Sequence, residues 1–244
     1  MADPDVSKPA EPPKPVHIGG ESIADRILPH LKKIVIGVIV LAVILSIFFG
    51  FRSYQQSKQA AETEKLAKVL SLAQRPVAAP GAPEDKNTPT FADPKARATA
   101  LLDELAKQGT SSLGAAFRGG LLLDAGKVDD AIAEYRKGTT AAGIEGLAAR
   151  EGLGIALETK AVAEQDPAAK QKLLEEALAA FVAMQPDDAG PRRGYALYHQ
   201  ARLHEVMGKP SEAKALYERA QEKAAASAEL SALVEKRLAG LGAS

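Results

Sequence analysis

The stretch FRGGLLLDAGKVDDAIAEYRKG, residues 117–138, decides the fold of this chain. Gly126 stands between two apolar segments, Ala131 follows it after five residues, and Tyr135 follows after four more. A glycine at this place can adopt the left-handed conformation that joins two helices, and a small alanine lets the second helix approach the first. The tyrosine then fills the space beside them, so the stretch predicts a pair of packed helices joined by a short turn.

The same spacing recurs further along the chain. In YHQARLHEVMGKPSEAKALYERA, residues 198–220, Gly208, Ala213 and Tyr217 keep the intervals of five and four residues. A middle copy in LLEEALAAFVAM indicates three helix pairs in all. The predicted repeat-packing residues are the small, turn and aromatic positions of these pairs: Gly119, Gly126, Ala131, Tyr135, Gly154, Ala177, Phe181, Ala201, Gly208, Ala213 and Tyr217.

The region after residue 93 has the composition of helices. No segment alternates like a strand, while Ala, Leu, Glu, Lys and Arg dominate between the Gly and Pro residues. The fold class is therefore predicted to be all-α. A last helix, residues 224–240, places Leu230, Leu233, Val234 and Leu238 on one face, and we expect it to cap the final pair.

Over about residues 94–240 this pattern resembles the tetratricopeptide repeat. The resemblance implies a tetratricopeptide-repeat-like α-solenoid, in which the first helices of the pairs line a concave face that takes up peptides or partner helices. The early Trp and the terminal Pro of the repeat are missing, and the middle repeat carries about eleven extra residues around KAVAEQDPAAKQ. These residues either lengthen both helices of the middle pair or form a protruding loop.

Residues 34–51, IVIGVIVLAVILSIFFGF, contain no charge and only one polar side chain, Ser46. A helix of this length spans about 27 Å, close to the hydrocarbon thickness of about 30 Å. A buried core helix and a cleaved signal peptide are the alternatives, but the run is apolar on every face and lacks a small-x-small site close behind it. We predict a retained transmembrane helix over residues 31–51. Basic residues flank both ends of this helix, so the positive-inside rule does not decide which end faces the cytoplasm.

The remaining segments differ in composition. Residues 1–30 form a Pro-rich head that we expect to be disordered, and residues 52–75 lack Gly and Pro and predict a helical stalk. Residues 76–92 form a Pro-rich linker. Asp93 and Pro94 then provide the cap and first turn of the next helix, which opens the tetratricopeptide-repeat-like domain of residues 93–244.

Charge and composition exclude several functions. Lys plus Arg and Asp plus Glu both total 31, so no basic field attracts nucleic acid, and the absence of Cys excludes thiol chemistry and cysteine-based metal sites. His199 and His204 are five residues apart and do not share a helix face as two metal ligands would. We find no catalytic constellation, and we predict no enzyme activity, no metal, no cofactor and no small-molecule substrate.

One stripe of residues is a candidate for binding a protein partner. Tyr195, Tyr198, Arg202 and Glu205 follow one another at spacings of three, four and three, which places them on one face of a first helix. Tyr and Arg are the types that most often dominate binding energy. The tyrosines either face the groove or pack under the cap helix, and Arg202 is expected in the groove. A second candidate, for an anion or acidic partner, is the pair Arg192 and Arg193.

The order of parts narrows the choice of family. A charged head, one span, a stalk, the helix KARATALLDELAKQG and the two repeat stretches together resemble the YfgM-type family of bacterial inner-membrane tetratricopeptide proteins. The resemblance implies a cytoplasmic N-terminus, a periplasmic repeat domain, and a chaperone-like adaptor role beside the Sec translocon, with translocon subunits, periplasmic chaperones or exported clients as partners. The alternatives are a structural scaffold in a secretion, pilus or motility complex, and an outward-facing organelle receptor.

Overall fold

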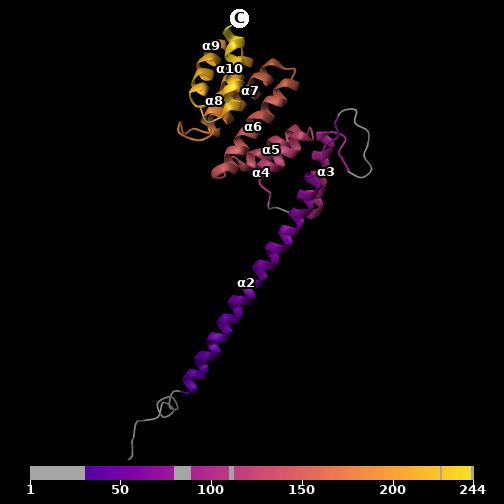
Figure 1. Cartoon of the computed structure of the whole chain (residues 1–244), viewed down its shortest axis with the longest axis vertical. Coiled ribbons are helices and arrows are strands. Elements are labelled where there is room, and N and C mark those ends of the chain that lie inside the picture. Colours follow the sequence, from indigo (N-terminus) through magenta and orange to yellow (C-terminus); the bar gives the residue numbers. More distant parts are fainter. Residues whose placement is uncertain (1–30, 80–88, 110–112, 226, 243–244) are drawn as a thin grey trace, which may run out of the picture. The chain divides into compact units, whose positions relative to one another are not determined.

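The computed structural model describes residues 31–79, 89–109, 113–225 and 227–242, and the head predicted for residues 1–30 lies outside them (Figure 1). Within these ranges the chain is helical apart from turns and a single bridge between Val77 and Phe91. The prediction of an all-α chain is confirmed. The helices are α2 (Leu31–Ala73), α3 (Pro94–Gln108), α4 (Ala115–Asp124), α5 (Val128–Gly138), α6 (Gly143–Ala163), α7 (Pro167–Met184), α8 (Arg193–Val206), α9 (Pro210–Glu222) and α10 (Ala228–Gly242).

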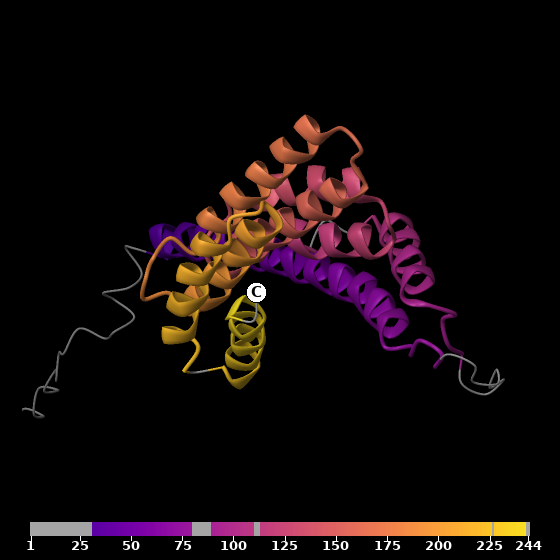
Figure 2. The ribbon, with the colours of Figure 1, turned by 90° about the horizontal axis from the view of Figure 1, so that it is seen from above.

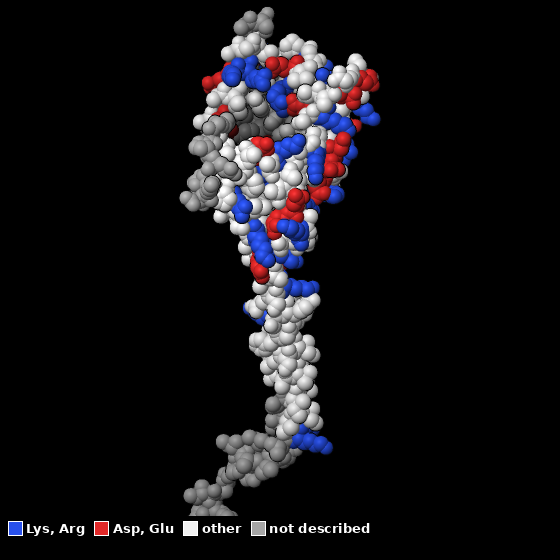
Figure 3. Space-filling model, turned by 90° about the vertical axis from the view of Figure 1, so that its right-hand side faces the viewer, with Lys and Arg blue, Asp and Glu red and all other residues white. Residues whose placement is uncertain are grey.

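Helix α2 contains the apolar segment. It is long and apolar enough to cross a membrane, and none of its most apolar stretch is buried against the rest of the protein. Figure 3 shows this segment with a surface free of charged side chains over most of its length. A core helix of a soluble protein would be covered, so the exposure of Ile47, Phe49 and their neighbours is typical of a membrane anchor.

The chain divides into two compact units, Met1–Gln59 and Ala60–Ser244. The second unit begins with the last turns of α2, because Val69 is buried in a cluster with residues of α3 and α4. Arg97 of α3 also donates a hydrogen bond of 2.7 Å to the carbonyl oxygen of Ala73. The carboxylate of Asp93 accepts from the backbone of Ala96 at 2.7 Å and caps α3, as its sequence predicts.

Three helix pairs follow, α4 with α5, α6 with α7 and α8 with α9, and each pair packs against the next (Figures 1 and 2). The middle pair is the longest: α6 has 21 residues and α7 has 18, whereas α4 has 10 and α5 has 11. The extra residues of the middle stretch therefore lengthen both helices and do not form a protruding loop. Asp166 and Pro167 start α7 directly after a short connection.

The small and aromatic positions meet inside the pairs. A methyl group added at Gly119 would stand 2.7 Å from the ring of Tyr135, and one added at Gly154 would stand 2.6 Å from the ring of Phe181. In the last pair, Ala201 and Tyr217 are both fully buried in one cluster. The three alanines at the next small position, Ala131, Ala177 and Ala213, are also fully buried.

The turns and the last helix complete the unit. Gly126 and Gly208 have φ values of 76° and 72°, the left-handed conformation that favours glycine. Helix α10 packs on α9 and α8, and its Leu230 and Val234 are buried in the same cluster as Tyr217. In the described part of the chain, the buried residues form three clusters that together extend from the end of α2 to α10.

Candidate protein-binding surfaces

The two tyrosines of the predicted binding stripe lie close to α10. Tyr198 is buried in the cluster that contains Leu230, and its ring centroid lies 5.8 Å from that of Tyr217. The hydroxyl of Tyr195 is 3.1 Å from the hydroxyl of Ser227, just before α10. Of the two roles considered for these side chains, the geometry favours packing under the last helix.

Arg202 and Glu205 complete the stripe, and both are bonded within the protein. The guanidinium of Arg202 donates through two nitrogens to the carboxylate of Glu158, which joins α8 to α6. Glu205 accepts a hydrogen bond of 3.0 Å from the hydroxyl of Tyr217 and lies 3.5 Å from a guanidinium nitrogen of Arg237. A partner would have to displace these internal bonds before it could use either charge.

The arginine pair before α8 is also engaged. Arg192 lies over the ring of Tyr195 at 4.3 Å and donates to Glu151 of α6, with 2.5 Å between nitrogen and oxygen. Arg193 donates to the backbone oxygen of Gln185 at 2.9 Å. All six predicted binding residues therefore have intramolecular partners, and their use by another protein stays a prediction.

Glu151 of α6 bonds to Arg192, just before α8, and lies close to His199 of α8. Its carboxylate lies 3.4 Å from Nε2 of His199, whose ring stacks on Phe181 with 4.6 Å between centroids. Burial by itself would raise the pKa of Glu151, but His199 and Arg192 outweigh it and lower the pKa below the ordinary value of 4.5. The ionised carboxylate is thus the form that the folded protein stabilises.

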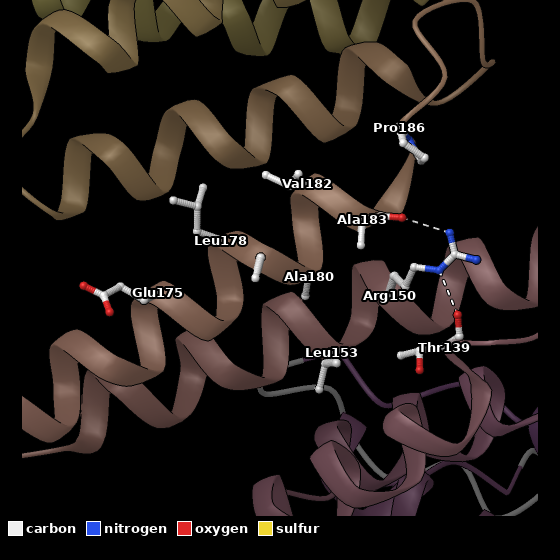
Figure 4. A pocket seen from close by; sticks show the side chains of 10 residues that line it. Thr139, Arg150, Leu153, Glu175, Leu178, Ala180, Val182, Ala183 and Pro186 are labelled. Carbon is white, nitrogen blue, oxygen red and sulfur yellow. Dashed lines mark hydrogen bonds between the residues drawn. The ribbon is translucent and has the colours of Figure 1, made fainter.

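A surface that the sequence analysis did not select lies on α7. Residues 177–184, ALAAFVAM, contain no polar side chain, so this part of the helix is apolar on every side. Phe181 and Met184 fill the core, whereas Ala179 and Ala183 are exposed and Val182 is 50% exposed. The outer side of α7 borders an open hollow of about 850 Å³ over Leu153 of α6 (Figure 4).

Arg150 stands at one end of this hollow. Its Nε donates to the backbone oxygen of Thr139 at 2.9 Å, and its Nη1 donates to that of Ala183 at 2.9 Å. Both acceptors lie at helix C-termini, where the carbonyl dipoles favour a cation. The guanidinium is thereby held between the ends of α5 and α7 (Figure 4).

A second hollow, of about 430 Å³, adjoins the first at Arg150. Ile144, in the first turn of α6, is 84% exposed at its edge. Its other apolar walls come from Leu147, Met184, Pro186 and Pro191, and Arg150 and Arg192 also line it. Of the predicted binding residues, Arg192 is the one that reaches this surface.

The sequence contained a signal for the surface on α7. A helix that has one face in water normally carries polar residues on that face, and residues 177–184 include none. The exposure of Ile144 had no such signal, because an isoleucine in a helical stretch is most often buried.

No cluster of three or more His, Asp or Glu side chains that could hold a metal ion is found in the part of the chain that the structure describes. The expectations of no metal, no cofactor and no enzyme activity stay predictions. No family model, no curated protein and no solved structure matches this chain.

Proposed function

We propose that this chain is a membrane-anchored adaptor that binds protein partners. In this proposal the three helix pairs form a tetratricopeptide-repeat-like α-solenoid, and α10 is its cap. The recurring contact between a small residue of the first helix and an aromatic ring of the second supports this assignment, since repeat arrays are built from such self-similar pairs.

The observation that carries the binding role is the exposure of Ile144. Ile144 is 84% exposed and lies at the edge of an apolar hollow, and a continuous apolar surface that polar groups border is typical of an interaction site. Arg150 and Arg192 provide that border. The chemistry fits a partner that presents an apolar side chain next to a carboxylate, which the positive charges of Arg150 and Arg192 attract while both guanidinium groups keep their bonds within the protein.

The cellular setting of the proposal comes from the resemblance to the YfgM-type family. We propose that α2 anchors the protein in the bacterial inner membrane, with the N-terminus in the cytoplasm and the repeat domain in the periplasm. The adaptor would then hold exported clients or periplasmic chaperones beside the Sec translocon. The apolar, uncovered surface of α2 supports the anchor, and the hollow beside Ile144 supports the holding of partners.

Photo-crosslinking in living cells tests this function. A crosslinking amino acid replaces Ile144 in the full-length chain, and the matched control replaces Val162, which is 74% exposed at the other end of the same helix. We expect exported proteins together with translocon or chaperone subunits at position 144 and few adducts at position 162. Position 198, in contrast, is buried and would report on the core.

Other results would contradict the proposal in distinct ways. Equal adducts at positions 144 and 162 would show that the hollow around Ile144 is not a binding site. One stoichiometric partner at position 144 would indicate a permanent scaffold. Protease digestion of intact and permeabilised cells gives the side of the membrane, and a repeat domain in the cytoplasm would exclude the family assignment.

A further inference from the structure

The outer side of α7 differs from the outer sides of the other second helices. On α5 the exposed positions include Asp129, Arg136 and Lys137, and on α9 they include Lys214 and Glu218. These are the charged residues expected on a helix that faces water. On α7 the exposed positions of the first half include Lys172 and Glu175, but the side chains that border the hollow from position 178 to position 183 are Leu, Ala and Val only.

Charged side chains stand at the two ends of this surface. Figure 4 shows Glu175 at one end and Arg150 at the other, with Ala180 and Ala183 between them. Arg150 is fixed at the level of Ala183, because it donates to the carbonyl oxygen of that residue. Positions 175 and 183 are eight residues apart, which is about 12 Å along a helix. The α7 surface is defined as Glu175, Leu178, Ala179, Val182, Ala183 and Arg150, and within it the acidic side chain stands at one end and the basic one at the other, with the exposed Lys172 just beyond Glu175.

Such a surface is complementary to itself. If two α7 helices lie antiparallel about a two-fold axis near Ala179, position 175 of each copy comes opposite position 183 of the other. Glu175 then meets Arg150 of the second copy, and the same contact forms twice. The small side chains of Ala179 and Ala183 let the two helices approach closely, and Val182 is covered on both copies.

We propose that a second copy of this chain covers the α7 surface, and that the protein is a two-fold symmetric dimer through α7. The dimer contact shares Arg150 with the hollow at Ile144, but the test of the dimer at Val182 and the crosslinking test at Ile144 can fail separately. It buries the one face of α7 that the fold leaves in water. It also places the two membrane anchors and the two partner-binding hollows in a single assembly.

The first test is the mass of the full-length protein in detergent, measured by light scattering over a dilution series. We expect a dimer, and we expect Val182→Glu to raise its dissociation constant by about tenfold or more, because the substitution places an unpaired charge in the contact. Val162→Glu is the matched control and leaves the dimer intact. A monomeric wild-type protein, or a dimer that Val182→Glu does not weaken, would overturn the proposal.

The second test uses the absence of cysteine from the sequence. Ala179→Cys introduces a single thiol beside the proposed axis, where the two copies come within the distance of about 7 Å that a disulfide requires. We expect oxidation to link two chains through position 179, and not through position 215 in Ala215→Cys, an exposed alanine of α9. Absence of a link at position 179, or crosslinks at both positions, would show that another contact or another partner occupies α7.

Discussion

Gly154 and Phe181 show how closely the middle helix pair packs. A Cβ atom at position 154 would stand 2.6 Å from the Phe181 ring, and that ring is fully buried and stacks on His199. We therefore predict that Gly154→Ala lowers the free energy of unfolding by about 1 to 3 kcal/mol, the usual result of overpacking a core. Urea denaturation followed by circular dichroism measures it.

Gly240 is the matched control, because an added Cβ there meets nothing within 4 Å. Gly240→Ala should leave the protein as stable or raise its stability by about 0.5 to 1 kcal/mol, since alanine favours a helix more than glycine does. If both variants behave alike, steric contact with Phe181 does not explain the glycine at position 154.

Tyr217 tests the last helix pair. Its ring is fully buried, so Tyr217→Ala should cost about 3 to 5 kcal/mol of stability, as large-to-small aromatic substitutions do. Tyr217→Phe keeps the ring and removes only the hydrogen bond to Glu205, and should cost about 0.5 to 1.5 kcal/mol. Equal losses in the two variants would mean that the hydroxyl, not the ring, stabilises this pair.

At the scale of elements, α6 and α8 are joined by charges. The folded state lowers the pKa of Glu151, so its ionised form contributes stability that is fully present above the ordinary pKa of 4.5 and is lost as the pH falls through the lower, folded value. We predict that Glu151→Gln destabilises the protein at pH 7. The difference from the wild type should shrink as the pH falls below about 4.5.

Thermal melts between pH 7 and pH 3 measure this effect. Glu222→Gln, at an exposed position of α9, is the control and should give a difference from the wild type that is small at every pH. A Glu151→Gln difference that stays constant with pH would show that packing, and not the carboxylate charge, joins the two helices.

At the scale of the whole molecule, the last turns of α2 belong to the folded unit that contains the helix pairs. Val69 is 1% exposed and lies against α3 and α4, whereas its neighbour Leu70 is 56% exposed. We predict that Val69→Asp lowers the unfolding free energy by about 3 kcal/mol, because it buries a charge without a partner. Leu70→Asp should change it by less than about 0.5 kcal/mol.

Both variants are made in the full-length chain, and unfolding is followed by protease resistance of the C-terminal part. Comparing the two variants shows whether the region before residue 76 is part of the folded unit or only a spacer. If Val69→Asp and Leu70→Asp have equal and small effects, this region is a spacer that does not contribute to the folded unit.

The sequence by itself determined the helices, the apolar segment that is long enough to span a membrane, and the small and aromatic positions. Each is a local property: hydrophobic periodicity, an uninterrupted apolar run, and glycines such as Gly126 where a turn needs a positive φ. These features follow from neighbours within a few turns of helix, so they can be read along the chain.

Only the tertiary structure decided which charges and surfaces remain available. Arg202 has a favourable position on its own helix, but its partner Glu158 is 44 residues away, and no periodicity reveals such a pair. The extra residues of the middle stretch could likewise lengthen both helices or form a loop, and only the lengths of α6 and α7 decide between these arrangements. Burial depends on contacts between distant segments, which is why the sequence could not show that Arg202 is bonded to Glu158 or that the fold leaves Ile144 and Val182 exposed.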